Sequence, residues 1–470
     1  MSKHDDTPRF RLTRRQALGS TAAAIGSAAV GSFGFNHLAY GDLPPPSGRA
    51  FIFCYFPGGW DQLLFLDPRD PVDFPDSERA RFQIETRYND LDGFSGFSSQ
   101  LVRPRDPSSP IVYGPAAAKV ADAVKLTDFA DRTAIVRGIS MNTLGHEVGY
   151  RYFLTGKFPA GNNARGTNIS TEIVGQMAPR RPLPNLSLRI ESYNDRQPGS
   201  ANAIRVDSIN DLLLLLAPSA YQERDVVESA LADYGQRVGP CATEVADRRG
   251  LYTSMRAARS QADQIVRERL ASNFGFVTDT ADAAAAIRTQ YGFALGDVNA
   301  PGARAAAAAA AIKSGMTQVA SLMIGVSTDT HFVGNQGHAP LLYQGVRALT
   351  AMLDDLRNTP HREGGNFLDH TTVLAFSEFT RTPMYNNFGG RDHHICGSCL
   401  LVGAGIRGNT VVGASSNLGM APMRWDFREN RVSDAGQAIL PEHIAATLLA
   451  SAGLDPYITR VDPISALLRT

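Results

Sequence analysis

The sequence predicts an α/β protein with a large, mostly parallel β-sheet sandwiched between helices. Two apolar, strand-like runs, within Val319–His331 and Thr371–Thr382, are separated by an amphipathic helical stretch. Each run ends in a polar loop that carries acidic residues. This order of strand, loop, helix, strand and loop is typical of parallel sheets, which bind ligands at the carboxyl ends of their strands.

The elements of the first half follow from apolar runs and their breaks. The run Ala50–Phe56 predicts a buried strand that ends at PGGWDQ, and Thr133–Ser140 predicts a second strand leading to a helix that starts near His146. Residues 62–130 are rich in Pro, Asp, Ser and Gly and predict loops. Apolar residues at spacings of three and four predict a helical insertion at about 205–300.

The second half continues with alternating helices and strands. Ala305–Ile312 predicts a packed helix with Gly315 as its stop. We expect His338 in a Gly-flanked loop, followed by a helix whose apolar stripe runs from Leu342 to Leu356. The run 399–413 predicts a strand, a turn and another strand, and a last helix begins near Pro441.

The first 41 residues have the composition of an export signal. Arg14-Arg15 precedes a weakly hydrophobic run, Ala17–Phe35, and small residues follow at 39–41. We predict a twin-arginine signal peptide at 1–41, a folded domain at 42–470, contact with the twin-arginine export machinery, and a periplasmic or secreted location. The alternative is a buried helix or a membrane anchor. No uncharged apolar stretch of 18 residues follows, so we expect no membrane span in the mature chain.

Charge and cysteine content exclude other classes. Lys plus Arg and Asp plus Glu both number 46, so no net field favours nucleic acid or an anionic membrane. Four cysteines are too few for a disulfide scaffold, and Cys396 with Cys399 cannot complete a four-cysteine zinc site. We expect a structural role for this pair; a disulfide, or a metal or redox role, stays open.

Histidines and carboxylates gather in the loops after the predicted strands. Asp329 and His331 are two residues apart, so on an extended chain both point to one side and can share a metal. Asp61 is either a further ligand or the start of an Asx turn. The predicted metal ligands are Asp61, Asp329, His331, Glu378, Asp392 and His393. Such ligands suit zinc, manganese or iron, and we predict one or two divalent ions.

Three residues are candidates for catalysis. His146, at a predicted helix start, is a ligand, an anion contact or a helix cap. Arg381 is either a clamp for phosphate or sulfate oxygens or an ion-pair partner of Glu378 or Asp392. His394 would face away from His393 on an extended chain, so one of the two is ligand or catalyst and the other a supporting group. P-loop, serine-nucleophile and HExxH motifs are absent from the sequence.

Several motifs together resemble a known family. They are GGWDQ at 58–62, HEVGYRYFLTG at 146–156, STDTH at 327–331, SEFTRTP at 377–383, GGRDHH at 389–394 and HIAATLLASAGLD at 443–455. With the twin-arginine start, they resemble the bacterial exported proteins that carry the domain DUF1501, which are grouped with the alkaline phosphatase and sulfatase superfamily. The resemblance implies a mostly parallel sheet with one or two metals at the carboxyl ends of its strands.

The resemblance also implies roles for individual residues. Asp61 corresponds to the Asp after the first strand, Asp329 and His331 resemble one metal-binding pair, and Glu378 stands where many members have an Asp. Asp392 with His393 lies where a late ligand is expected. The chain departs from the superfamily at the nucleophile, because His146 occupies the position of the modified Cys of sulfatases and the nearest hydroxyl belongs to Thr143.

These observations predict an exported, metal-dependent hydrolase that acts on a phosphate or sulfate ester of a small molecule or glycan. Water activated by the metal would then replace a protein nucleophile. The alternative, from another class, is a non-catalytic exported binding or assembly protein that retains the fold.

Overall fold

The computed structural model describes residues 48–177, 181–217 and 270–469, with a few further positions between 218 and 269. All of these belong to one compact unit, Leu43–Thr470. The predicted signal peptide and the middle part of the predicted helical insertion lie outside the described residues. The two flanks of that insertion are helical, at α5 (Ile209–Leu216) and α8 (Asp282–Tyr291).

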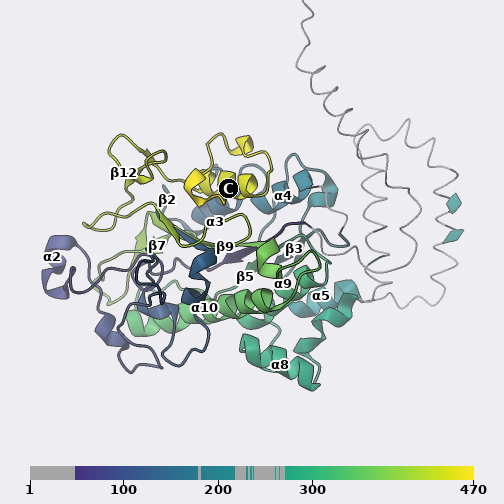
Figure 1. Cartoon of the computed structure of the whole chain (residues 1–470), viewed down its shortest axis with the longest axis horizontal. Helices are drawn as coiled ribbons and strands as arrows, with labels where there is room; N and C mark the ends of the chain where they lie inside the picture. Colours follow the sequence, from purple (N-terminus) through teal and green to yellow (C-terminus); the bar gives the residue numbers. More distant parts are fainter. Residues whose placement is uncertain are drawn as a thin grey trace, which may run out of the picture. The chain divides into compact units, whose positions relative to one another are not determined.

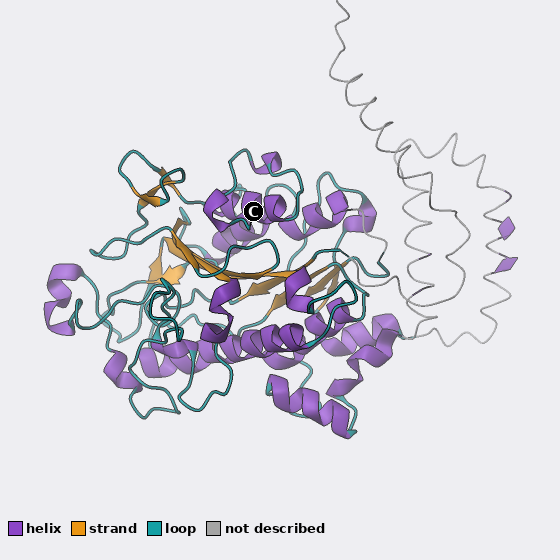
Figure 2. Ribbon diagram, in the orientation of Figure 1, coloured by secondary structure: helices purple, strands orange, loops and turns teal. Residues whose placement is uncertain are grey.

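An eight-stranded mixed sheet forms the centre of the described unit (Figures 1 and 2). Its strands are β1 (Ala50–Tyr55), β2 (Thr133–Ser140), β3 (Asn185–Leu188), β4 (Ile204–Val206), β5 (Val319–Met323), β6 (Thr371–Phe376), β9 (Cys396–Gly403) and β10 (Thr410–Val412). Their order is β10-β2-β9-β6-β1-β5-β3-β4, and only β9 runs antiparallel to its neighbours. The prediction of a large, mostly parallel α/β sheet is confirmed.

Helices cover both faces of this sheet. The α-helices within the described residues are α2 (Arg79–Phe82), α3 (His146–Thr155), α4 (Ile169–Met177), α5, α8, α9 (Pro301–Lys313), α10 (Asn335–Asn358), α11 (Phe367–His370) and α12 (Pro441–Ser451). Figure 1 shows α9 and α10 on one side and α3 and α4 on the other. Along β1, Ile52 and Cys54 pack with α9 and α10, whereas Phe51 and Phe53 pack with α3, α4 and α12. Both sides of β1 are therefore buried, as its unbroken apolar run predicts.

The connections agree with the sequence in most places. Residues 62–130 consist of turns and short helices, with five short helical segments between Asp76 and Arg132. The Ala-rich helix α9 begins at Pro301 and is followed by Gly315 in the left-handed region, at φ +77°. His338 is an exception, since it lies in the first turns of α10 and not in a loop.

The cysteine pair lies in β9. Cys54, Cys396 and Cys399 are all free thiols buried in the core. Burial raises the pKa of each thiol above its ordinary value, so all three are held in the neutral form. The structural role predicted for Cys396 and Cys399 agrees with this placement in the sheet.

Strand direction brings the candidate residues to one edge of the sheet. β1, β5 and β6 are mutually parallel, and β2 runs with β6 because both are antiparallel to β9. The carboxyl ends of β1, β2, β5 and β6 therefore meet the amino end of β9. Two short strands, β7 (Thr380–Arg381) and β8 (His393–His394), pair with each other beside this edge.

Candidate metal centre

Three imidazole rings and one carboxylate converge at this edge. Oδ1 of Asp329 lies 3.1 Å from Nε2 of His331, 3.5 Å from Nε2 of His146 and 3.6 Å from Nε2 of His393. The ligand atoms of His146, Asp329 and His393 all lie within 4.8 Å of one another. Three separate segments supply these groups: the loop after β5, the first residue of α3, and β8 just before β9.

Each ring is held through its other nitrogen. Nδ1 of His146 lies 2.6 Å from Oε1 of Glu378, and Nδ1 of His331 lies 2.7 Å from Oδ1 of Asp392. Nδ1 of His393 lies 2.6 Å from the carbonyl oxygen of Leu144. All three partners are acceptors, so each neutral ring carries its proton on Nδ1 and presents a lone pair on Nε2.

The three Nε2 atoms consequently form a set of electron-pair donors around the Asp329 carboxylate. Nε2 of His146 is buried and has no hydrogen-bond partner among the described residues. The Nε2 atoms of His331 and His393 are 2.9 Å apart, a distance at which two lone pairs repel unless a cation lies between them. Ligand atoms around a tetrahedral zinc ion lie roughly 3.3 Å apart, so this donor set fits a divalent metal.

The carboxylates of Glu378 and Asp392 lie behind the rings. Both oxygens of the buried Glu378 are used, since Oε1 also accepts from the Gly58 amide at 2.7 Å and Oε2 accepts from the Ser377 hydroxyl at 2.9 Å. Oδ1 of Asp392 accepts from Nδ2 of Asn386 at 3.0 Å in addition to His331. Carboxylates in these positions fix the orientation and tautomer of metal-binding histidines.

The side chain of Arg381 also contacts this cluster. Its guanidinium is fully buried, donates to the carbonyls of Gly58, Gly59 and Arg391, and turns one edge toward the cluster. Nη2 lies 2.6 Å from Oδ1 of Asp329, and Nη1 lies 3.2 Å from Nε2 of His331. Its ion-pair partner is therefore Asp329, and not Glu378 or Asp392.

Two predicted site residues lie apart from this cluster. The buried Asp61 accepts from the amides of Leu63 and Leu64 through Oδ1, and its Oδ2 lies 2.9 Å from Nε of Arg391. This is the Asx-turn arrangement, with an added buried ion pair. His394 uses both ring nitrogens elsewhere, on the carbonyl of Gly419 at 3.1 Å and the amide of Cys396 at 3.2 Å.

Burial and neighbouring charges shift the pKa values of the cluster in different directions. Burial acts to raise the pKa of Asp329, but the hydrogen bond and charge of Arg381 lower it overall, so the carboxylate stays ionised. Burial acts to lower the pKa of His146, yet the hydrogen bond to Glu378 raises it overall. Burial lowers the pKa of His393, which favours the neutral, ligand form of that ring.

Some groups that support the cluster could not be recognised from the sequence. Asn386 donates to the His331 carbonyl and to Asp392, and it lies in a loop whose composition suggests only a turn. The carbonyl of Leu144 is a main-chain group, and the type of residue does not indicate which carbonyl accepts a hydrogen bond. Arg391 is next to the predicted ligand Asp392 in GGRDHH. Its partner Asp61 is distant in the sequence, so the pair could not be recognised.

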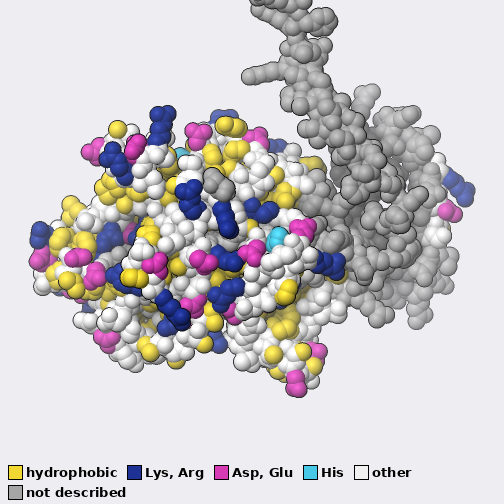
Figure 3. All heavy atoms as spheres, viewed as in Figure 1, with side chains coloured by type: hydrophobic (Ala, Val, Ile, Leu, Met, Phe, Trp, Pro, Cys, Tyr) yellow, Lys and Arg dark blue, Asp and Glu magenta, His cyan; other side chains and the backbone are white. Residues whose placement is uncertain are grey.

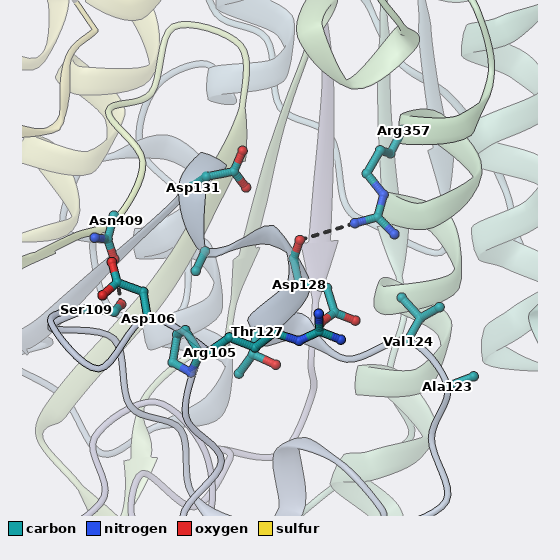
Figure 4. A pocket seen from close by; sticks show the side chains of 12 residues that line it. Arg105, Asp106, Ser109, Ala123, Val124, Thr127, Asp128, Asp131, Arg357 and Asn409 are labelled. Carbon is teal, nitrogen blue, oxygen red and sulfur yellow. Dashed lines mark hydrogen bonds between the residues drawn. The ribbon is translucent and has the colours of Figure 1, made fainter.

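A pocket elsewhere in the unit does not share these features. A cavity of about 570 Å³ is lined by cationic Arg105 and Arg357 and by anionic Asp106, Asp128 and Asp131 (Figure 4). Arg357 donates to the Asp128 carbonyl at 3.1 Å. The segment around Asp128 leads into the amino end of β2, at the sheet edge opposite the candidate metal centre. Its mixed charges favour no one ligand.

Fold and site together define a class: α/β proteins with histidines and carboxylates gathered at the carboxyl edge of a mostly parallel sheet. The model of the family described as "Protein of unknown function (DUF1501)" matches residues 49–457, and the chain belongs to this family. No curated protein and no solved structure matches the chain. Within the described residues, no helix is long and apolar enough to cross a membrane.

Proposed function

We propose that this protein is an exported, metal-dependent hydrolase of phosphate or sulfate esters of a small molecule or glycan. The observation that carries the proposal is the convergence of three Nε2 lone pairs on the Asp329 carboxylate, each ring held from behind through Nδ1. His146, Asp329 and His393 would bind a zinc, manganese or iron ion, with His331 as a fourth donor.

A metal bound there would polarise the ester oxygen and lower the pKa of a bound water toward neutrality. The chain itself orients the reaction. Glu378 and Asp392 would hold the rings of His146 and His331, and Arg381 would keep a positive charge beside the position of the ester oxygens. Thr143, the nearest hydroxyl in the sequence, accepts from the Gly145 amide at 3.1 Å, which favours water as the nucleophile.

Exposure of the cluster favours an enzyme over a purely structural metal site. The Asp329 side chain is 44% exposed, and the rings of His146, His331 and His393 are all partly exposed. A catalytic zinc keeps one coordination position open to solvent, whereas a structural zinc is closed by four protein ligands. The non-catalytic exported binding or assembly protein remains the alternative, because Arg381 directs most of its donors to main-chain carbonyls.

Export and superfamily membership belong to the same proposal. The twin-arginine sequence at 1–41 supports a periplasmic or secreted location, where the folded protein would arrive with its metal. The sheet with its site at the carboxyl edge supports a relationship to the alkaline phosphatase and sulfatase superfamily.

Elemental analysis of signal-cleaved protein, purified without chelators or added metal, tests the proposal. We expect one or two equivalents of zinc, manganese or iron, and loss of that metal in Asp329→Ala and His393→Ala. His394→Ala is the matched control, since this neighbouring histidine lies outside the cluster and its loss should leave the metal in place. Metal-loaded protein should then hydrolyse phosphate or sulfate esters.

The absence of metal, together with an unchanged unfolding temperature when these ions are added, would overturn the metal centre. Full metal content without hydrolysis of any ester would favour the binding or assembly protein.

A further inference from the structure

A cluster of cationic side chains lies at the carboxyl end of α3, the end away from His146. A cavity of about 510 Å³ opens where this helix ends, lined among others by Lys157, Phe158, Arg165, Arg196 and Tyr457. A helix of ten residues is about 15 Å long, so this cavity is separate from the metal centre at His146. We name it the basic pocket.

The cations of the basic pocket outnumber its anions. Lys157, Arg165, Arg196 and Arg460 line it, and Glu442 is its one acidic lining residue. Across the described part of the chain, no carboxylate forms an ion pair with Lys157, Arg165 or Arg460, although Arg196 pairs with Glu172. Glu442 accepts from the Tyr152 hydroxyl at 2.6 Å, and burial raises its pKa toward the neutral form.

Residues with a left-handed backbone position two of these cations, Lys157 and Arg460, at the pocket. The helix ends at Gly156 in the left-handed region, with φ +58°, and the next residue, Lys157, enters the cavity. The lysine lies across Gly166, where an added Cβ would come within 2.7 Å of Nζ. Arg460 also has a left-handed backbone, with φ +63°, which is uncommon for a residue with a side chain.

The cations of the basic pocket act on one another. Burial lowers the pKa of Lys157 and the charges of Arg196 and Arg460 lower it further, while the charges of Asp195 and Glu172 act in the opposite direction. Three donors without carboxylate partners match the oxygens of a phosphate or sulfate group, which accept several charge-assisted hydrogen bonds.

Aromatic side chains at the rim indicate what carries that group. Tyr457 is 72% exposed and Phe158 is 40% exposed. A neighbouring cavity of about 640 Å³ shares Tyr457 and Arg460 with the basic pocket and is lined by Trp425 and Phe427. The flat, exposed ring of Tyr457 offers an apolar surface for the face of a sugar ring, while its hydroxyl stays in water.

We infer that the basic pocket binds a saccharide carrying a phosphate or sulfate group, with Lys157, Arg165 and Arg460 on the oxyanion and Tyr457 against the sugar. This site is distinct from the metal centre, and its test needs no catalytic activity. On the face of the protein seen in Figure 3, basic and acidic side chains are interspersed.

Calorimetric titration of the full signal-cleaved protein at low ionic strength tests this inference. The probes are a sulfated disaccharide, a phosphorylated monosaccharide, the same two sugars without their charged groups, and inorganic sulfate and phosphate. We expect at least one charged sugar to bind, its uncharged form to bind at least ten-fold more weakly, and the inorganic ions to fall between. Which charged sugar binds more tightly then distinguishes sulfate from phosphate.

Charge-removing variants identify the pocket. Lys157→Gln and Arg460→Gln should each weaken binding of the charged sugar at least five-fold, whereas Arg460→Lys should retain most of it. Arg431→Gln, at an exposed arginine of β12 (Arg431–Val432), should leave binding unchanged. Unaltered unfolding temperatures for Arg460→Gln would confirm that folding is intact.

Three results would overturn the inference. They are failure of both charged sugars to bind, equal binding of charged and uncharged sugars, and binding that Lys157→Gln and Arg460→Gln leave intact. Inorganic ions binding as tightly as the charged sugars would overturn the role of Tyr457 and reduce the site to one for a simple anion.

Discussion

Glu378 contacts both His146 of the candidate metal centre and the backbone that supports it. Oε1 accepts from His146 and from the Gly58 amide, so the carboxylate fixes the ring relative to the loop after β1. Replacing such a supporting carboxylate reduces metal affinity about 10–100-fold in comparable sites. We expect this loss for Glu378→Gln, because the amide no longer stabilises the Nδ1 proton as a charged acceptor does.

A competitive titration with a zinc-binding dye measures that affinity. Glu442→Gln is a suitable control, because it changes a carboxylate of α12 whose side-chain hydrogen bond is to Tyr152, away from His146 at the start of α3. Equal zinc affinity in Glu378→Gln and the native protein would contradict the proposed role of Glu378.

The contacts of Asp61 predict that this residue stabilises the fold. Its carboxylate is buried and paired with the buried Arg391 at 2.9 Å. Removing one partner of a buried ion pair costs about 3–5 kcal/mol, because the other charge stays buried without compensation. We expect Asp61→Asn to lose this much free energy of unfolding in urea, while its folded fraction keeps the bound metal.

The exposed pair of Asp70 with Arg103 provides the comparison. Its atoms lie 3.3 Å apart, and Asp70→Asn should change the free energy of unfolding by less than about 1 kcal/mol. Loss of metal from folded Asp61→Asn would restore Asp61 as a ligand.

Residue spacing in the sequence identified part of the centre. Asp329 and His331 could be paired because they are two apart in one loop, and both reach the cluster. The pairing of Asp61 with Arg391 could not be predicted, since it spans most of the chain and depends on how two loops pack. The sequence predicts His146 as a ligand, an anion contact or a cap. A helix start alone does not determine which of these partners holds the ring.

Helix α3 sets the position of His146 through a close contact at Gly149. A Cβ at this position would lie 2.3 Å from the Glu378 carbonyl oxygen, which is a main-chain atom. Gly149→Ala should therefore push the helix away from the loop after β6 and separate His146 from Glu378. We expect a loss of about 1–3 kcal/mol in the free energy of unfolding, and weaker zinc binding.

Urea unfolding and zinc titration measure the two effects separately. Gly275→Ala is the control, because a Cβ there meets no atom within 4 Å. Unchanged zinc affinity in a destabilised Gly149→Ala would show that α3 does not position the ring.

The sequence predicts where the strands lie in the chain better than the direction in which each strand runs in the sheet. The runs that became β1, β2, β5, β6 and β9 were all recognised as strands from apolar residues and breaking glycines. The antiparallel direction of β9 could not be predicted from its composition, because a strand buried on both faces is apolar in either direction. That direction is what brings Asp392 and His393, which precede β9, to the edge where β6 ends.

One buried histidine links three segments of the unit at this edge. His338, on α10, accepts from the Asp61 amide through Nε2 at 2.9 Å, and its Nδ1 lies 2.7 Å from the Thr330 hydroxyl. It thereby joins the loop after β1, the loop after β5 and a helix that covers the sheet. A proton on Nε2 would remove the bond from Asp61, so the folded protein requires the neutral ring.

This requirement makes stability depend on pH. Burial lowers the pKa of His338 to about 4, whereas an unfolded histidine has a pKa near 6.5. Between these values the unfolded chain binds a proton that the folded protein does not. The free energy of unfolding should therefore fall as the pH drops from about 6.5 to about 4, by about 3 kcal/mol in all. Above pH 6.5 the contribution is complete, and below pH 4 it decreases no further.

Urea unfolding of the native protein and of His338→Gln at pH 7, 5.5 and 4 isolates this contribution. Gln lacks a titrating group, and the other ionisable groups are the same in both proteins, so their effects cancel in the difference. The native protein should be the more stable at pH 7, and its advantage should shrink by about 3 kcal/mol at pH 4. A constant difference across this range would mean that His338 is not held neutral, and that acid acts on the edge through other groups.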